Sequence, residues 1–180
     1  MSESDKKDNL FSQPHVAGGM VRPFIQGSKV QLARYIEANE FASKHKIMDA
    51  YHRCLYEASS LLEHLATVVT YIENVDVKLQ IHETIKDFRH HIRHDARGEF
   101  DEKRSKKRAE RLGLNDKLLV GVEFPLNAIK IGNTELTTDQ IGQYLDSVDT
   151  LAYGLMLGVT LQVSDDGVAV SQSEQKNADK

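Results

Sequence analysis

The feature that most limits the fold is a stripe of apolar residues between positions 47 and 72, where an apolar side chain recurs every three or four positions. The stripe consists of Ile47, Tyr51, Leu55, Ala58, Leu62, Leu65, Val69 and Ile72, and Met48, Leu61 and Val68 widen it. This spacing places all of these side chains on one face of an α-helix. Because the face is both long and wide, it is typical of the central helix of a bundle.

Three further stripes predict the helices that cover this one. One helix begins near Ser28, a residue suited to an N-cap, and another covers residues 81–97. The last follows a capping box from Thr137 to Gln140 and ends near Gly158. Their stripes are Val30, Ala33, Ile36 and Phe41; Ile81, Ile85, Phe88 and Ile92; and Ile141, Tyr144, Leu145, Val148, Leu151, Ala152, Leu155 and Met156. The sequence therefore predicts an up-and-down bundle of four or so helices.

A short segment before the last helix has the alternating pattern of β-strands. Residues 128–131 alternate, and Gly132-Asn133 follows, two residues that tolerate positive φ and suit a tight hairpin turn. An apolar run at 118–124, bounded by Pro125, is a candidate third strand. We therefore expect a mainly α fold with a small β-hairpin near 118–136, inserted before the last helix.

Polar segments flank this predicted core. Residues 1–27 contain the adjacent Gly18 and Gly19 and are interrupted by Pro14 and Pro23, which predicts a disordered N-terminal tail. Residues 163–180 are rich in Ser, Asp, Gln and Lys, which predicts a disordered C-terminal tail. One helical-bundle domain, residues 28–162, remains between them, as suits a chain of 180 residues.

The composition narrows the class of protein. The formal net charge is −4, so any nucleic-acid binding has to use a local basic patch. Cys54 is the single cysteine, which excludes an internal disulfide and fits a reducing compartment. No apolar run reaches the ~18 residues needed to cross a bilayer, and the first residues lack the basic-then-apolar order of a signal peptide. We therefore expect a cytoplasmic protein that does not engage a membrane.

Half of the chain's eight histidines lie in the predicted 81–97 helix. Opposite its apolar stripe, at spacings of four, three and four, stand Glu83, Asp87, His90 and His94. One interpretation is a solvated face with acid–histidine pairs. Another is a metal site in which His90 and His94 bind one ion, joined by Glu83, by Asp87 or by His64 of the preceding helix. We expect no metal and no other cofactor, because neither a cysteine pair nor a His-Glu-x-x-His motif accompanies these residues.

The third interpretation is acid–base cleavage of RNA. RNA carries its own nucleophile, the 2′-hydroxyl, so a catalyst needs a group that transfers a proton near neutral pH and a cation that stabilises charge on the phosphate. Histidine supplies the first and arginine the second. A strongly basic run from Lys103 to Arg108 follows the helix and offers contacts to flanking phosphates.

The stretch Arg89-His90-His91-Ile92-Arg93-His94 resembles the signature of HEPN-type nucleases, in which an arginine, a polar residue and three variable residues precede a histidine. Arg89 matches the motif arginine, His90 the polar position and His94 the motif histidine. The resemblance implies a helical bundle that forms a homodimer with two facing motifs. It also implies a metal-independent endoribonuclease, or an RNA-binding protein without that activity, of a toxin–antitoxin or defence system, with an antitoxin or regulatory protein as a partner.

The resemblance gives each candidate residue a role. His94 transfers the proton, Arg89 binds the scissile phosphate, and His90 supports both, while Asp87 or Glu83 holds a histidine tautomer. The residues expected to bind the flanking RNA are Arg93, Arg97, Lys103, Arg104, Lys106, Lys107 and Arg108. The alternative is a non-enzymatic helical accessory protein that binds partner proteins through its charged faces. The acidic net charge and the lack of a second catalytic motif favour this alternative.

Overall fold

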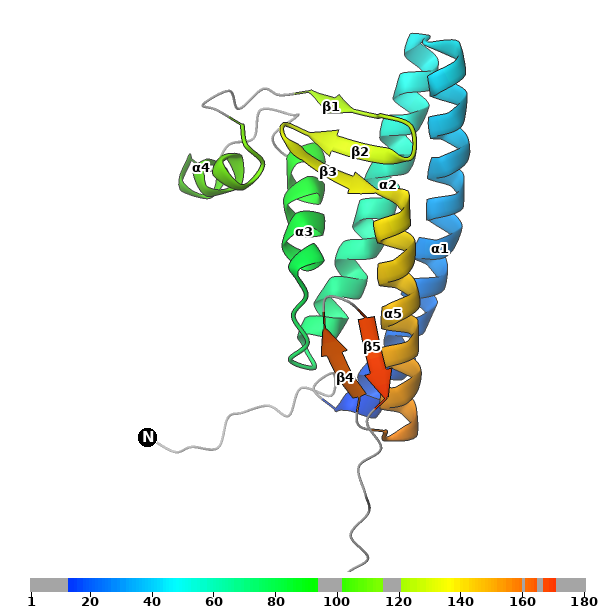
Figure 1. Ribbon diagram of the computed structural model, residues 1–180, viewed down its shortest axis with the longest axis vertical. Helices are drawn as coiled ribbons and strands as arrows, with labels where there is room; N and C mark the ends of the chain where they lie inside the picture. Colours follow the sequence, from blue (N-terminus) through cyan, green and yellow to red (C-terminus); the bar gives the residue numbers. More distant parts are fainter. Residues whose placement is uncertain (1–12, 94–101, 115–120, 160, 165–166, 171–180) are drawn as a thin grey trace, which may run out of the picture.

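The computed structural model describes residues 13–93, 102–114, 121–159, 161–164 and 167–170. These residues form five helices and five strands, in the order α1 (Pro14–His45), α2 (Met48–Glu73), α3 (Gln80–Arg93), α4 (Glu102–Arg111), β1 (Val122–Glu123), β2 (Ala128–Ile131), β3 (Thr134–Thr137), α5 (Thr138–Leu157), β4 (Leu161–Ser164) and β5 (Gly167–Val170). Helices α1, α2 and α5 run side by side along the molecule, and α3 packs against α2 (Figure 1). The prediction of a mainly helical bundle with a small β-structure before the last helix is confirmed.

The core lies where the predicted stripes meet. On α2, Leu61, Leu62 and Leu65 are fully buried, and on α3 so are Ile85 and Phe88. Burying each side chain of this size contributes about 1.5–3 kcal/mol to holding the apolar faces of the two helices together. In the described part of the chain, no helix has both the length and the apolar character that crossing a membrane demands.

Helix α1 begins much earlier than its sequence suggested. It starts at Pro14, which occupies the first turn, where a missing N–H costs nothing, and it continues through Pro23. Gly18 permits the approach to α5, because a Cβ there would lie 2.6 Å from the carbonyl oxygen of Ala152. The expectation of disorder is therefore wrong for residues 14–27, and Ser28 is a buried helix-interior residue rather than an N-cap. Residues 1–12 lie outside the described residues.

The turn between α1 and α2 is made by a lysine. Lys46 adopts the left-handed conformation, with φ of 45°, and its N–H donates to the carbonyl of Ala42. The α2 stripe then reaches the surface at its start, where Ile47 is 53 % and Met48 is 67 % exposed. The tip of this helical hairpin therefore presents apolar side chains to solvent.

The small sheet has the antiparallel order β1-β2-β3. Ile131 pairs with Thr134 around the Gly132-Asn133 turn, where Gly132 has a φ of 60°, so the predicted hairpin is confirmed. Strand β1 supplies the third strand through Val122, while residues 118–120 of the predicted run lie outside the described residues.

Buried polar side chains fasten this sheet to the helices. Tyr35 of α1 donates its hydroxyl to the carbonyl of Ala128 at 2.6 Å. Asn39 donates to the carbonyl of Pro125 at 2.9 Å and accepts from the N–H of Asn127 at 2.7 Å. The connection before β2 therefore finds its hydrogen-bond partners inside the bundle rather than in water.

Helix α5 closes the bundle. The predicted capping box is present, since the Thr137 hydroxyl accepts from the N–H of Gln140 at 3.1 Å and the Gln140 side chain accepts from the N–H of Thr137 at 2.9 Å. Gly158 ends the helix in the left-handed conformation, also as predicted. Lys29 of α1 reaches across to Asp149 at 3.2 Å, which adds an ion pair to the seam between α1 and α5.

The segment after α5 contains ordered structure that was expected to be tail. Strand β4 pairs with β5 in antiparallel register, with Val163 opposite Val168. This hairpin contacts α5 and lies between α3 and α5 (Figure 1). The predicted boundary at residue 163 is therefore wrong as far as Val170, and residues 171–180 lie outside the described residues.

Candidate nucleic-acid interface on helix α3

The apolar stripe of α3 faces the core as predicted, but two of its histidines are buried as well. Ile85, Phe88 and Ile92 are buried, and His82 and His91 are each only 1 % exposed. The residues left toward solvent include Glu83 and Arg93, with Arg89 and His90 half-buried. The first two residues of the predicted motif, Arg89 and His90, therefore lie on the outer face of α3.

The two arginines of the motif converge on one carboxylate. Arg89 donates from Nε to Oε2 of Glu63 at 2.8 Å, and Arg93 donates from Nη1 to Oε1 of the same residue at 3.1 Å. Glu63 stands on α2, and all three side chains are between 36 % and 48 % exposed. No sequence pattern points to Glu63, because its partners lie 26 and 30 residues further along the chain.

Arg89 also lines a groove between α2 and α3. The groove has a volume of about 490 Å³, and its walls are formed by Glu63, Ala66, Thr67, Thr70, Tyr71, Asn74, Lys86 and Arg89. Arg89 and Lys86 place two positive charges against the single negative charge of Glu63. The groove is therefore open to solvent, but its two cations are both paired, Arg89 with Glu63 and Lys86 with Glu73 and Glu83.

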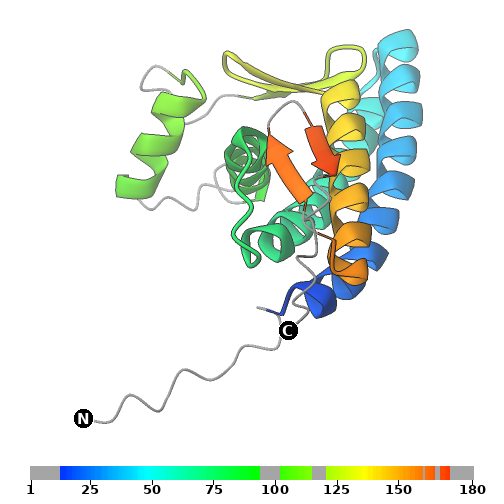
Figure 2. The ribbon, with the colours of Figure 1, turned by 60° about the horizontal axis from the view of Figure 1, so that its bottom comes forward.

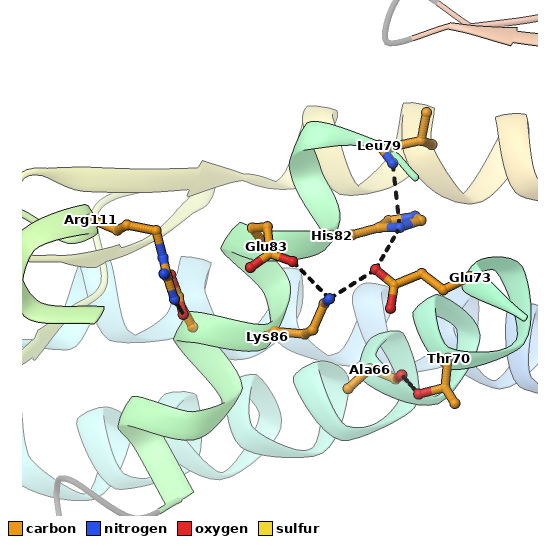
Figure 3. A network of polar contacts seen from close by, with 9 residues as sticks. Ala66, Thr70, Glu73, Leu79, His82, Glu83, Lys86 and Arg111 are labelled. Carbon is orange, nitrogen blue, oxygen red and sulfur yellow. Dashed lines mark hydrogen bonds and ion pairs between the residues drawn. The ribbon is translucent and has the colours of Figure 1, made fainter. Parts of the chain in front are cut away.

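Lys86 belongs to a network of polar contacts that extends to the buried His82 (Figure 3). Its Nζ donates to Glu73 and to Glu83, each at 2.8 Å. The Nδ1 atom of His82 lies 3.5 Å from the same oxygen of Glu73 and accepts from the N–H of Leu79 at 3.5 Å. The network fixes Lys86 at the rim of the groove and leaves its charge balanced by two carboxylates.

The protonation of this network follows from burial and charge. Burial lowers the pKa of His82, and the nearby carboxylate of Glu73 opposes this shift only in part. The hydrogen bond from Lys86 lowers the pKa of Glu83. The Nδ1 atom of His82 faces both the N–H of Leu79 and the carboxylate of Glu73, whereas Nε2 is buried with no hydrogen-bond partner in the described part of the protein.

The expected role of the acidic residues beside the histidines is not what the geometry shows. Asp87 was expected on a solvated face, but it is 6 % exposed and receives two hydrogen bonds from Arg111 of α4, each at 2.6 Å. Such a two-pronged pair between a guanidinium and a carboxylate fixes orientation as well as distance. Asp87 therefore fastens α4 to α3, and Glu83 binds Lys86.

Helix α4 brings part of the basic run to the motif helix. It lies at the outer edge of the molecule, on the side of α3 away from α1 (Figure 2). Lys107 is exposed, whereas Arg108 is only 4 % exposed, so Lys107 rather than Arg108 faces solvent. The side chains of Lys103, Arg104 and Lys106 lie outside the described residues.

The second half of the motif also falls outside the described residues. His94 and Arg97 follow the last described residue of α3, Arg93. The structure therefore brings together Arg89, Arg93 and Lys86, and it places His90 half-buried on the same helix.

The metal interpretation gains no support from the residues the structure describes. Among them, no three His, Cys, Asp or Glu side chains gather in a way that would hold an ion. His64, the proposed ligand from α2, has its Nδ1 2.9 Å from the carbonyl of Ser60, so that nitrogen donates a hydrogen bond and only Nε2 is left to accept one or to bind an ion.

Comparison of the chain with models of known protein families, with curated proteins and with solved structures found no match. The HEPN resemblance consequently rests on Arg89, His90 and His94 alone and stays a prediction.

Proposed function

We propose that this protein is a HEPN-like RNA-binding protein that cleaves RNA without a metal, using the motif that begins at Arg89. The observation that supports the proposal is the groove between α2 and α3, where Arg89 and Lys86 line the wall in partly exposed ion pairs that an RNA phosphate can replace. A phosphate of RNA placed there meets a guanidinium able to donate two parallel hydrogen bonds.

Each motif residue has a defined task in this mechanism. Arg89 binds the scissile phosphate and stabilises the negative charge that grows on it. His94 transfers the proton that activates the 2′-hydroxyl or that leaves with the 5′-oxygen, and His90 supports both residues. The ion pair of Arg89 with Glu63 must open when RNA binds, and its partial exposure makes that step cheap, because such pairs are worth about 0.2–1 kcal/mol.

The RNA-binding surface extends beyond the groove in this proposal. Arg93 and Lys107 contact flanking phosphates, together with the predicted residues Arg97, Lys103, Arg104 and Lys106. Arg108 has no place in that surface because it is buried. The active unit is a homodimer in which two motifs face each other, and an antitoxin or regulatory protein is the expected partner. Such a site predicts an affinity for RNA that falls steeply with salt.

The test is cleavage of a mixed RNA pool in EDTA by the wild-type protein and by the Arg89→Ala and His94→Ala variants. Arg53→Ala is the matched control, since Arg53, on the surface of α2, is likewise held in an exposed ion pair, with Glu37 at 3.1 Å. We expect cleavage by the wild type and the control and none by the two motif variants. Circular dichroism checks that all four proteins are folded. Equal activity in all four, or none in any, refutes the nuclease.

A second candidate function is the non-enzymatic accessory protein, and one observation favours it. Glu63 binds both Arg89 and Arg93, so the two arginines have a structural task, joining α3 to α2, that needs no RNA. In that case the charged faces of the molecule recognise a partner protein, and Arg89→Ala lowers stability without changing any activity toward RNA.

A further inference from the structure

We propose that the tip of the α1–α2 hairpin is a docking site for a partner segment that carries a bulky apolar side chain next to a carboxylate. The site is an open pocket of about 530 Å³ lined by Ala42, Lys46, Ile47, Met48, Tyr51 and Phe124. It lies at the N-terminal end of α2, whereas the groove beside Arg89 follows its C-terminal half, so the two proposals are independent.

The floor of this pocket is preformed. The Tyr51 hydroxyl donates to the carbonyl of Val122 at 3.0 Å, which fixes the ring against the sheet. The rings of Tyr51 and Phe124 pack with centroids 5.3 Å apart. Ser43, which also borders the pocket, already donates to the carbonyl of Glu40 at 2.8 Å. An incoming apolar group therefore meets a rigid aromatic surface with few polar groups left to satisfy.

The rim of the pocket consists of apolar side chains that the fold leaves uncovered. Ile47 is 53 % and Met48 is 67 % exposed, although both belong to the same helical stripe as the buried core residues. Adjacent exposed apolar side chains around a concavity are typical of a surface that binds another chain. Methionine suits such a rim, because its unbranched side chain adapts to the shape of what it covers.

The charge at the pocket specifies the partner. Of the described side chains that line it, Lys46 alone carries a charge, and no described carboxylate forms an ion pair with it. Neighbouring Lys44, in contrast, already has Glu40 at 3.9 Å. A carboxylate beside the apolar group of the partner can therefore form an ion pair with Lys46.

The backbone at Lys46 supports a role other than folding. Its φ of 45° lies in the left-handed region, where glycine is the favoured residue at the end of a helix. A lysine at this position costs stability relative to glycine, yet it places an ammonium group at the pocket. The positive charge at the C-terminus of α1 offsets part of this cost through the helix dipole.

This arrangement allows a test in which loss of binding cannot come from unfolding. A random heptapeptide library is displayed and selected against the wild-type chain, and the consensus peptide is then synthesised. We expect enriched peptides to combine a bulky apolar residue with Asp or Glu one or two positions away. Met48→Asp should lower the affinity for the consensus peptide by about tenfold or more. Lys46→Gly should lower it by about threefold.

Three controls make the result decisive. Lys46→Gly should raise the melting temperature while it weakens binding, and Lys44→Gln should change neither affinity nor stability appreciably. Replacing the acid of the peptide by its amide should weaken binding to the wild type but not to Lys46→Gly. The proposal is overturned if no peptide is enriched, if the enriched peptides lack the acid, or if Lys46→Gly and Met48→Asp bind like the wild type. Concentration-dependent sedimentation that Met48→Asp abolishes would instead identify a second copy of the chain as the occupant.

Discussion

Replacing Glu63 by glutamine tests whether Arg89 and Arg93 bind an RNA phosphate or only join α3 to α2. In the wild type both arginines donate to the Glu63 carboxylate, at 2.8 Å and 3.1 Å. An RNA phosphate has to compete with that carboxylate for the same donors. Glutamine keeps the size of the side chain and one acceptor oxygen but removes the negative charge, so it weakens the competitor without opening a cavity.

The size of the effect follows from the exposure of the pairs. All three side chains are between 36 % and 48 % exposed, so each ion pair contributes about 0.2–1 kcal/mol. Loss of both charge interactions should lower the free energy of unfolding by about 0.5–2 kcal/mol. The melting temperature should fall by about 2–4 °C for each kcal/mol lost. If the arginines bind phosphate, the same free energy becomes available to the complex, and the affinity for RNA should rise about 2- to 30-fold.

The assay is fluorescence anisotropy of a labelled single-stranded RNA, measured in EDTA with His94→Ala as the background so that the probe stays intact. Glu37→Gln is the matched control, because that exposed carboxylate pairs with Arg53 at 3.1 Å outside the groove. The gain in affinity should shrink as salt is raised. An unchanged or weaker affinity in a folded Glu63→Gln protein would refute phosphate binding by these arginines and leave them as a link between α2 and α3.

Three further predictions concern the scaffold around the site. Asn39→Leu removes a buried donor to Pro125 and a buried acceptor for Asn127, so the free energy of unfolding measured in urea should fall by about 2–5 kcal/mol. A fall of less than about 1 kcal/mol would contradict the described hydrogen bonds. Asp87→Asn should cost about 1–2 kcal/mol and speed amide exchange in α4, because the pair with half-exposed Arg111 is its tie to α3; unchanged exchange in α4 argues against that tie. Since burial lowers the pKa of His82, the unfolded state binds its proton more readily, and stability should fall as the pH drops below the ordinary value of 6.5. The melting temperature between about pH 7.5 and 5.5 should therefore fall less in His82→Asn than in wild type, and equal slopes would show that other groups control the acid response.

The parts of the fold that could be predicted are those fixed by nearby residues. The stripe on α2 and the core face of α3 follow from a repeat of three or four positions, and Phe88 lies where that repeat places it. The Gly132 turn and the Thr137 capping box depend on two to four consecutive residues, so the sequence contains all that is needed to identify them.

The parts that could not be predicted depend on distant partners. Gly18 suggested a flexible tail, but its small size is what allows α1 to approach Ala152 of α5. Asp87 belonged to a polar stripe, yet it is buried because Arg111, 24 residues away, covers and neutralises it. The helical pattern does not distinguish His82 from its neighbours, although its ring packs against that of Tyr144 with centroids 5.5 Å apart. A helical repeat in one segment carries no information about which other segment will lie against it.

The seam between α1 and α5 has a consequence for the way the chain reaches its fold. Lys29 and Asp149 meet across 120 residues of sequence, so this pairing needs the closure of a very long loop. Contacts of such range form late and slow the folding of a domain, whereas the α1–α2 hairpin is local and can form early. Until α5 docks, Leu145, Val148 and Leu151 are missing from the core cluster, and the apolar faces of α1 and α2 stay open to other chains. We therefore expect the docking of α5 to be the late step that covers the apolar faces of α1 and α2.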